Sequence, residues 1–278
     1  VVDADVHLVG VVSLRQLVIA SPSTLVQDIM DPDVISVPAS ADQEEAARLM
    51  ARYDLIALPV VDTENHLLGV ITHDDLVEVL QEEATEDIYR LGGIPKGQAA
   101  DAPLLAVLRS RLPWLVLNLA TASITASVLS LFESTLARVA ILAAFFPMVA
   151  GVSGSAGTQT LTVTVRRLAL GELMSRDVLF AWLREVRIGL CNGVTIGLLV
   201  ATVALLWKGV PVLGVVAGAA ICLNMLAAAT AGVVVPVSMQ SLKIDPALAS
   251  PILVTTLTDT LGYFFYLGLA TLALTQLS

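Results

Sequence analysis

Asp259 is the residue with the strongest case for chemistry, because it is charged and lies well inside a long apolar stretch. An ionisable side chain is costly in a bilayer, so it is a functional candidate by default. Polar or small residues lie three, four or seven positions away, on one face of a helix: Thr255, Thr256, Gly262, Tyr263 and Tyr266. Together with Asp259 they form one polar stripe on an otherwise apolar helix, which favours a functional role for this face. The alternative is an aspartate hydrogen-bonded inside a packed bundle.

A second stretch combines proline, glycine and hydroxyl side chains. Phe146 and Pro147 are followed by small and polar residues: Gly151, Gly154, Ser155, Gly157, Thr158, Gln159 and Thr160. Proline and glycine permit a broken helix, which a membrane tolerates where the backbone lines a cavity. The same spacing also suits a close contact between two helices. Spacing alone leaves both alternatives open.

Composition indicates which elements must hold these residues. Of 278 residues, 56% are hydrophobic and 14% charged, and the mean hydropathy is +0.83. This excludes an ordinary cytosolic globule. Five stretches reach the roughly 20 apolar residues that a membrane span needs: 113–132, 139–165, 188–207, 212–237 and 251–274. We therefore predict a multidomain protein with an all-α membrane domain of five helices at residues 109–278, embedded in a lipid bilayer.

The first third of the chain has a different character. Residues 1–101 carry 19 acids and 5 bases, whereas residues 102–278 carry 6 acids and 10 bases. Phosphate binding needs a basic surface, so nucleic acid is excluded as a partner of the acidic third. Multivalent cations suit it better.

An internal repeat organises this acidic part. Residues 1–18 and 60–77 match at 9 of 18 positions, including His7 and His66. A fixed period indicates a repeated unit, here a strand, a turn, a strand and a helix. Both histidines are predicted to be turn residues rather than metal ligands. Ser40 is predicted to cap a further helix that runs to about Tyr53.

Acidic side chains follow the second copy of the repeat, on a predicted helix that ends near Gly92. The acids are Glu82, Glu83, Glu86 and Asp87, so several share one side of the helix. Such a run is usually a solvated face. The alternative is that these carboxylates share a divalent cation with acids of the soluble domain.

Basic residues flanking the spans predict the orientation. With the acidic domain in the cytoplasm, eight arginines or lysines lie on the inner flanks and two on the outer flanks. This distribution follows the positive-inside rule. We predict a multi-pass protein of the cell (inner or plasma) membrane with a cytoplasmic N-terminus and, after five spans, a C-terminus outside.

Residues 22–81 resemble a CBS domain, a small α/β module that binds adenosyl ligands. Residues 1–21 resemble the tail of a first, truncated CBS domain, and residues 82–108 form the acidic connecting helix and linker. The resemblance implies a nucleotide site for ATP at Gly69, Thr72 and Asp75. The alternative is that Thr72 and Asp75 cap the following helix.

Residues 22–278 as a whole resemble the MgtE-type magnesium channels, which join paired CBS domains to five spans. Two segments carry the likeness, FFPMVAGVSGSAGTQTLTVTVRRLALGEL and DPALASPILVTTLTDTLGYFFYLGLA. The resemblance implies a homodimer whose pore is lined by the second and fifth spans. The implied pore-lining residues are Gly154, Ser155, Gly157, Thr255, Thr256 and Tyr263. Asp259 matches the family aspartate that binds hydrated Mg²⁺, and Asp245 and Glu185 match two further family acids. Ser155 stands where the family usually has Asn.

These observations predict a channel for hydrated divalent cations rather than an enzyme. Mg²⁺ keeps several waters in most protein sites, which suits one carboxylate per chain. No nucleotide-hydrolysing P-loop and no second intramembrane acid occur, so passive uptake is expected. Mg²⁺ bound among the acids of the soluble domain and of Glu82–Asp87 would favour the closed state. Two alternatives remain: a transporter coupled to protons or sodium, and a membrane sensor that passes no ion.

Overall fold

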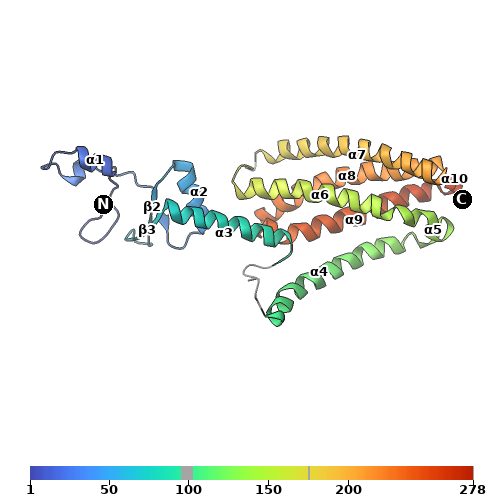
Figure 1. Ribbon diagram of the computed structural model, residues 1–278, viewed down its shortest axis with the longest axis horizontal. Coiled ribbons are helices and arrows are strands. Elements are labelled where there is room, and N and C mark those ends of the chain that lie inside the picture. Colours follow the sequence, from blue (N-terminus) through green and yellow to red (C-terminus); the bar gives the residue numbers. More distant parts are fainter. Residues whose placement is uncertain (95–102, 175, 278) are drawn as a thin grey trace. The chain divides into compact units, whose positions relative to one another are not determined.

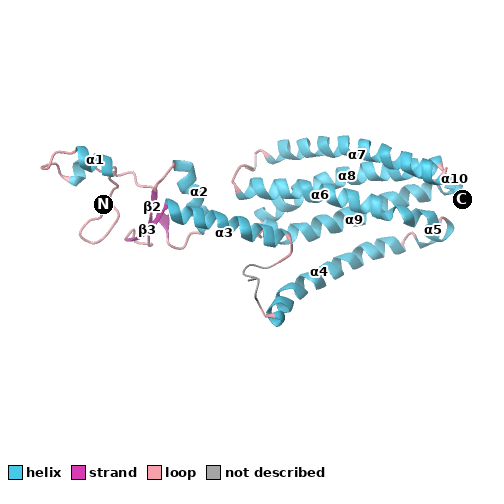
Figure 2. Cartoon of the chain, in the orientation of Figure 1, coloured by secondary structure: helices cyan, strands magenta, loops and turns pink. Residues whose placement is uncertain are grey.

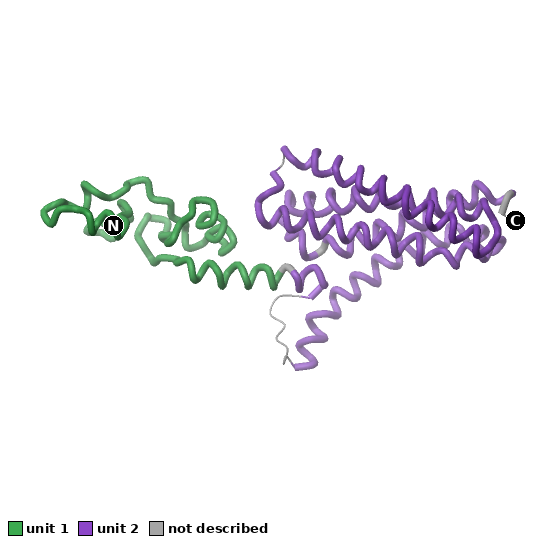
Figure 3. The backbone as a smooth tube through the Cα atoms, turned by 45° about the horizontal axis from the view of Figure 1, so that its top comes forward, with its two compact units in different colours: residues 1–86 green, residues 87–278 purple. Residues whose placement is uncertain are grey.

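The structure, a computed structural model, describes residues 1–94, 103–174 and 176–277. The chain divides into two compact units, residues 1–86 and residues 87–278 (Figure 3). The first unit mixes strands and helices, and the second is helical (Figure 2). This arrangement confirms the predicted fold class, a CBS-type α/β domain followed by membrane-spanning helices.

A small sheet and two helices form the body of the first unit. Its elements are α1 (Leu14–Ile19), the 3-10 helix η1 (Val26–Asp28), β1 (Val37–Pro38), α2 (Gln43–Tyr53), β2 (Ala57–Val61), β3 (Leu67–Thr72) and the start of α3 (His73–Leu91). β1 pairs with β2 in parallel, and β2 pairs with β3 antiparallel. The core contains Met50, Leu58 and Leu76. The helix α2 is capped by Asp42, whose side chain accepts a hydrogen bond from the Glu44 N–H at 3.0 Å, and not by Ser40 as predicted.

The two copies of the repeat differ in structure. The second copy has the predicted order of β2, turn, β3 and α3. In the first copy, α1 forms, but the predicted strands are reduced to isolated bridges, one of which joins His7 to His66. The Leu8 N–H donates to the Asn65 carbonyl at 3.0 Å. The two copies therefore meet at their turns.

Long helices make up the second unit (Figure 1). They are α4 (Leu104–Ser130), the short α5 (Glu133–Arg138), the 3-10 helix η2 (Ala140–Phe145), α6 (Phe146–Ala169), α7 (Val178–Lys208), α8 (Pro211–Ser241), α9 (Pro246–Leu272) and the short α10 (Leu274–Leu277). Five segments are long and apolar enough to cross a membrane, which confirms the five predicted spans. Three helices begin well before the predicted spans, at Leu104, Val178 and Pro246. In α4 and α7 the helix continues through arginine-containing turns that hydropathy alone excludes.

The helix α8 forms the centre of this unit, and its buried residues lie on every side. A helix that is apolar all round belongs in the interior. Its contact with α7 is close because glycines face each other: a Cβ added to Gly197 would lie 2.7 Å from the Gly218 carbonyl oxygen. The helix α4 contacts α9, where the Thr125 and Thr260 hydroxyls lie 2.8 Å apart, and diverges from the bundle toward its N-terminal end (Figure 1).

The structure of the second span distinguishes a broken helix from close helix packing at its glycines. α6 is a continuous α-helix through Gly154 and Gly157, and the only irregular part of this span is the 3-10 segment η2 before it. Pro147 lies in the first turn of α6, where a missing N–H costs nothing. A Cβ on Gly157 would lie 3.0 Å from Val254 of α9. Gly157 therefore serves close helix packing, and none of these glycines breaks the helix.

Candidate functional site

Asp259 lies near the middle of α9 and is half-buried. Within the described part of the chain, its carboxylate has no hydrogen bond and no ion pair. The alternative of an aspartate bonded inside the bundle is therefore not what the structure shows. A carboxylate held at mid-membrane depth without a protein partner is suited to attract a cation.

The predicted stripe around Asp259 divides into two parts. Thr255 is exposed, and Tyr263 is half-buried with its ring centroid 5.0 Å from that of Phe146. Tyr266 is fully buried beside Phe146, and Gly262 is buried against Asn224. The stripe prediction is wrong for these last two positions because α6 and α8 cover α9 at that height.

Thr256 lies beside the exposed part of this stripe. Its side chain is half-buried, and its hydroxyl donates to the Ile252 carbonyl at 2.7 Å. The hydroxyl is thus satisfied by the backbone of its own helix, and its oxygen still has the capacity to accept one more hydrogen bond.

The helix α6 brings its glycines next to the aspartate. Gly154 and Gly157 face Thr258, the buried residue directly before Asp259: a Cβ on either glycine would lie 3.7 Å or 3.3 Å from the nearest Thr258 atom. Ser155 is exposed, and its hydroxyl donates to the Gly151 carbonyl at 2.9 Å. The structure therefore brings the α6 glycines next to the Asp259 turn, and their role as pore-lining residues stays a prediction.

Glu185 and Asp245 each have a protein partner elsewhere. The Glu185 carboxylate on α7 accepts a hydrogen bond from the Thr160 hydroxyl of α6 at 3.2 Å. Asp245 caps α9 by accepting from the Ala247 N–H at 2.8 Å, and it forms an ion pair with Arg90 at the end of α3. No described contact joins either acid to Asp259. Their role as ion ligands stays a prediction.

The acids at the start of the connecting helix do not share one environment. Glu82 is exposed, and Glu83 is half-buried and accepts a hydrogen bond from the Gln43 amide of α2. Glu86 is buried, with 5% of its surface exposed. The side chain of Asp87 lies outside the described residues. A uniformly solvated face is therefore wrong for this run, since Glu83 bonds to α2 and Glu86 is buried.

The predicted nucleotide residues lie at the junction of β3 and α3. The Asp75 carboxylate accepts from the Thr72 N–H and from the Thr72 hydroxyl, both at 2.8 Å. The Thr72 hydroxyl also contacts Asp74, and this hydrogen bond lowers the pKa of the Asp74 carboxyl. These bonds start α3 as a helix cap does. Gly69 leaves open space around its Cα.

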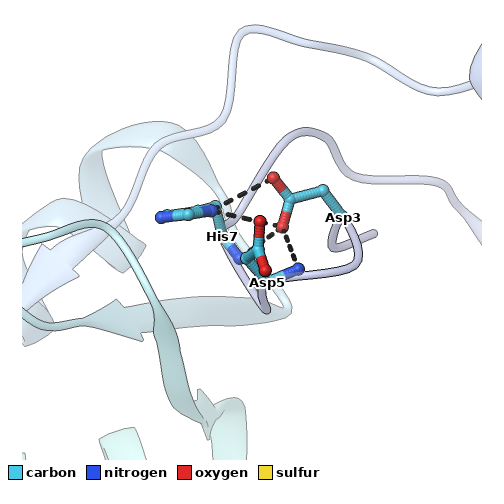
Figure 4. A group of neighbouring side chains, drawn as sticks. All are labelled: Asp3, Asp5 and His7. Carbon is cyan, nitrogen blue, oxygen red and sulfur yellow. Dashed lines mark hydrogen bonds and ion pairs between the residues drawn. The ribbon is translucent and has the colours of Figure 1, made fainter.

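The sequence missed a group of ligand-type side chains in the first turn of the repeat. Atoms of Asp3, Asp5 and His7 that could hold a metal ion lie within 4.8 Å of one another (Figure 4). The His7 ring also stacks on His66, with centroids 4.5 Å apart. Hydrogen bonds from the His7 N–H and ring lower the pKa of Asp3. The alternating Asp-x-Asp-x-His spacing was the available signal.

The comparisons with known proteins agree with the two-part structure. A family model described as MgtE, divalent cation transporter, matches residues 146–269, and a CBS domain model matches residues 26–82. The magnesium transporter MgtE of Bacillus subtilis is 39% identical over 271 residues, which are 98% of this chain and 60% of that protein. The chain belongs to the MgtE family. Its five apolar helices make it a multi-pass membrane protein of that family.

Other relatives extend this assignment. The magnesium transporter MgtE of Thermus thermophilus is 42% identical over 276 residues, covering 99% of this chain and 61% of that protein. The chain thus spans about three-fifths of the length of the MgtE relatives it matches. A solved cytosolic domain of the Mg²⁺ channel MgtE in complex with ATP is 52% identical and covers 28% of this chain and 32% of that chain, with a TM-score of 0.28. MgtE is a family of transporters, not of enzymes.

Proposed function

We propose that this chain forms a homodimeric channel for passive uptake of Mg²⁺. The observation that carries the proposal is Asp259, a mid-membrane carboxylate without a hydrogen bond or ion pair in the described part of the chain. Two such carboxylates facing each other across a two-fold axis would bind a hydrated dication through its water shell. Mg²⁺ releases its inner water reluctantly, so a site that leaves the shell in place suits it.

The remaining pore surface would come from the residues beside Asp259. Thr255 is exposed on α9, and Thr256 and Tyr263 are half-buried. Gly154, Ser155 and Gly157 keep the facing part of α6 free of large side chains, although Gly157 itself packs against α9. Hydroxyls and small residues hydrogen-bond a water shell without displacing it. We propose Asp245 and Glu185 as further acids for the ion, nearer the cytoplasmic ends of α9 and α7.

Two variants test the dimeric pore. In a background with Cys191→Ser and Cys222→Ser, Asp259→Cys in membranes should be linked into a dimer by a bifunctional thiol reagent whose spacer matches the width of a hydrated ion, because that gap is too wide for a direct disulfide. The matched control is Leu198→Cys on α7, an exposed position with 65% of its surface accessible. Cross-linking at Leu198 but not at Asp259 would show that the α9 helices do not face each other.

For regulation, we propose that cytosolic Mg²⁺ binds the acids of the first unit and of α3 and favours the closed state. Glu83 already bonds to Gln43 of α2, so a cation shared by Glu83 and nearby acids would hold this part of α3 against α2. We further propose that ATP binds at Gly69, Thr72 and Asp75, where β3 leads into α3. The N-terminus would be cytoplasmic and the C-terminus outside, in the cell membrane. Calorimetric titration of the purified chain with ATP, with and without Asp75→Ala, tests the nucleotide site.

A further inference from the structure

A cleft that shares Glu185 with the proposed ion pathway has, as a whole, a charge opposite to that expected of a cation site. It lies between α6, α7 and α8 and has a volume of about 260 Å³. Its charged lining residues are Arg167, Arg184 and Glu185, so the net formal charge is +1. The two guanidinium groups favour an anion.

Both arginines are available to a ligand. Within the described ranges, neither Arg167 nor Arg184 forms an ion pair or a hydrogen bond with the protein. The carboxylate of Glu185, in contrast, already accepts a hydrogen bond from Thr160, whose side chain is buried. The two positive charges of the cleft are therefore the ones without a protein partner.

The walls of the cleft are apolar beyond the arginines. Val163 on α6 and Ile188 on α7 line it and keep 51% and 42% of their surface exposed. Met225 and Ala229 of α8 form its floor. A polar end with two arginines and an apolar side between two membrane helices match the two parts of a phospholipid.

The position of the arginines along the helices agrees with this reading. Arg167 lies in the last turn of α6, which ends at Ala169, and Arg184 lies in the second turn of α7, which begins at Val178. Both are therefore at the same end of the bundle, at the depth where a spanning helix meets the lipid headgroups. Basic pockets between spanning helices at such an interface suit anionic headgroups.

We propose that this cleft binds an anionic phospholipid of the phosphatidylglycerol type, with its phosphodiester between Arg167 and Arg184. A single negative charge matches the net charge of the lining. The amides of Gln159 and Asn192, which also line the cleft, would bond the headgroup hydroxyls. An acyl chain would lie along Val163 and Ile188. Between the two guanidiniums a cation is disfavoured, and an apolar partner helix would leave them without a counter-charge.

Fluorescence quenching by brominated lipids tests the proposal. Trp182 lies three residues before Glu185, on the same side of α7, and Trp114→Phe with Trp207→Phe leaves it as the sole tryptophan. The full chain is reconstituted in phosphatidylcholine bilayers that contain either brominated phosphatidylglycerol or brominated phosphatidylcholine at equal fraction. We expect phosphatidylglycerol to be preferred at least about fivefold, since each basic residue at the surface strengthens the attraction by about that factor.

Matched variants separate the cleft from general surface charge. Arg167→Gln with Arg184→Gln should reduce the preference to about one, whereas Arg167→Lys with Arg184→Lys should retain most of it. Arg166→Gln with Arg187→Gln removes two exposed arginines from the same helices, outside the cleft lining, and should reduce the preference by a clearly smaller factor than the cleft pair does. An equal loss in this control pair overturns the proposal.

Two measurements on the protein that keeps Arg167 and Arg184 also test the lipid proposal. Equal quenching by the two brominated lipids would show that the cleft holds no anionic lipid. Loss of the preference on adding millimolar glycerol 3-phosphate would assign the cleft to a soluble phosphate instead, which likewise overturns the lipid proposal. Persistence of the preference in that competition supports it.

Discussion

Replacing Asp259 by Asn is the perturbation that bears most directly on the proposed ion site. The change removes the negative charge but keeps a side chain of the same size that hydrogen-bonds water. Through one water layer, the carboxylate would lie about 4 Å or more from the ion, where a dication and a single charge attract each other by about 2 kcal/mol in bulk water and about 8 kcal/mol at an effective dielectric of about 20.

The half-buried position of Asp259 places the effect between these limits and nearer the lower one. A loss of about 3 kcal/mol per chain reduces affinity about a hundredfold. At Mg²⁺ concentrations below saturation, uptake by Asp259→Asn should therefore fall to about 1% of the parent value. The partner aspartate in a dimer is removed by the same substitution, so the loss is at least this large.

Uptake is measured with a Mg²⁺-sensitive dye inside proteoliposomes, after gel filtration has shown that the variant folds. Glu172→Gln is the control, because it removes an exposed acid elsewhere in the same unit. Asp259→Glu, which keeps the charge, should retain part of the flux. If Asp259→Asn retains more than half of the parent uptake, the assignment of the ion site is wrong.

Three further predictions concern packing, pH and the acidic unit. Gly157→Val should lower the stability of the detergent-solubilised chain by about 1–3 kcal/mol, since its Cβ would meet α9 at 3.0 Å, whereas Gly151→Val, with open space around it, should unfold like the parent. A hydrogen bond with Asp62 raises the pKa of His66 above 6.5 and lowers that of Asp62 below 3.8. The first unit should therefore lose stability as pH rises through the raised pKa of His66, and again as pH falls through the lowered pKa of Asp62. In thermal melts, His66→Gln should abolish the loss at the upper end. Millimolar Mg²⁺ should slow proteolysis within Glu82–Gly97 more than sodium chloride at equal ionic strength, because it bridges carboxylates rather than only screening them; equal protection by both salts contradicts the regulatory proposal.

The sequence was sufficient where a local property determines the structure. Five spans follow from apolar length, and the second copy of the repeat follows from strand and turn patterns that need no distant partner. The bond between Thr72 and Asp75 is likewise local, and it is the half of a capping box in which the residue three positions into the helix accepts from the residue before the helix.

Features that depend on distant segments were beyond the sequence. Tyr266 lies two turns from Asp259 on the same side of α9, yet only the packing of Phe146 makes it a core residue. The ion pair of Asp245 with Arg90 joins positions more than 150 residues apart. The bond between Thr160 and Glu185, and the arginine cleft beside it, require α6 and α7 to be placed together first.

The central claim is that the chain by itself conducts Mg²⁺ passively, and reconstituted flux at fixed voltage measures this most directly. Liposomes containing only the purified chain are given an inward Mg²⁺ gradient, with protons and sodium equal on the two sides. We predict Mg²⁺ uptake that follows the Mg²⁺ gradient and does not change when a proton or sodium gradient is imposed. Uptake that requires either of those gradients would contradict the channel in favour of a coupled transporter, and liposomes that pass no ion would leave the chain a membrane sensor.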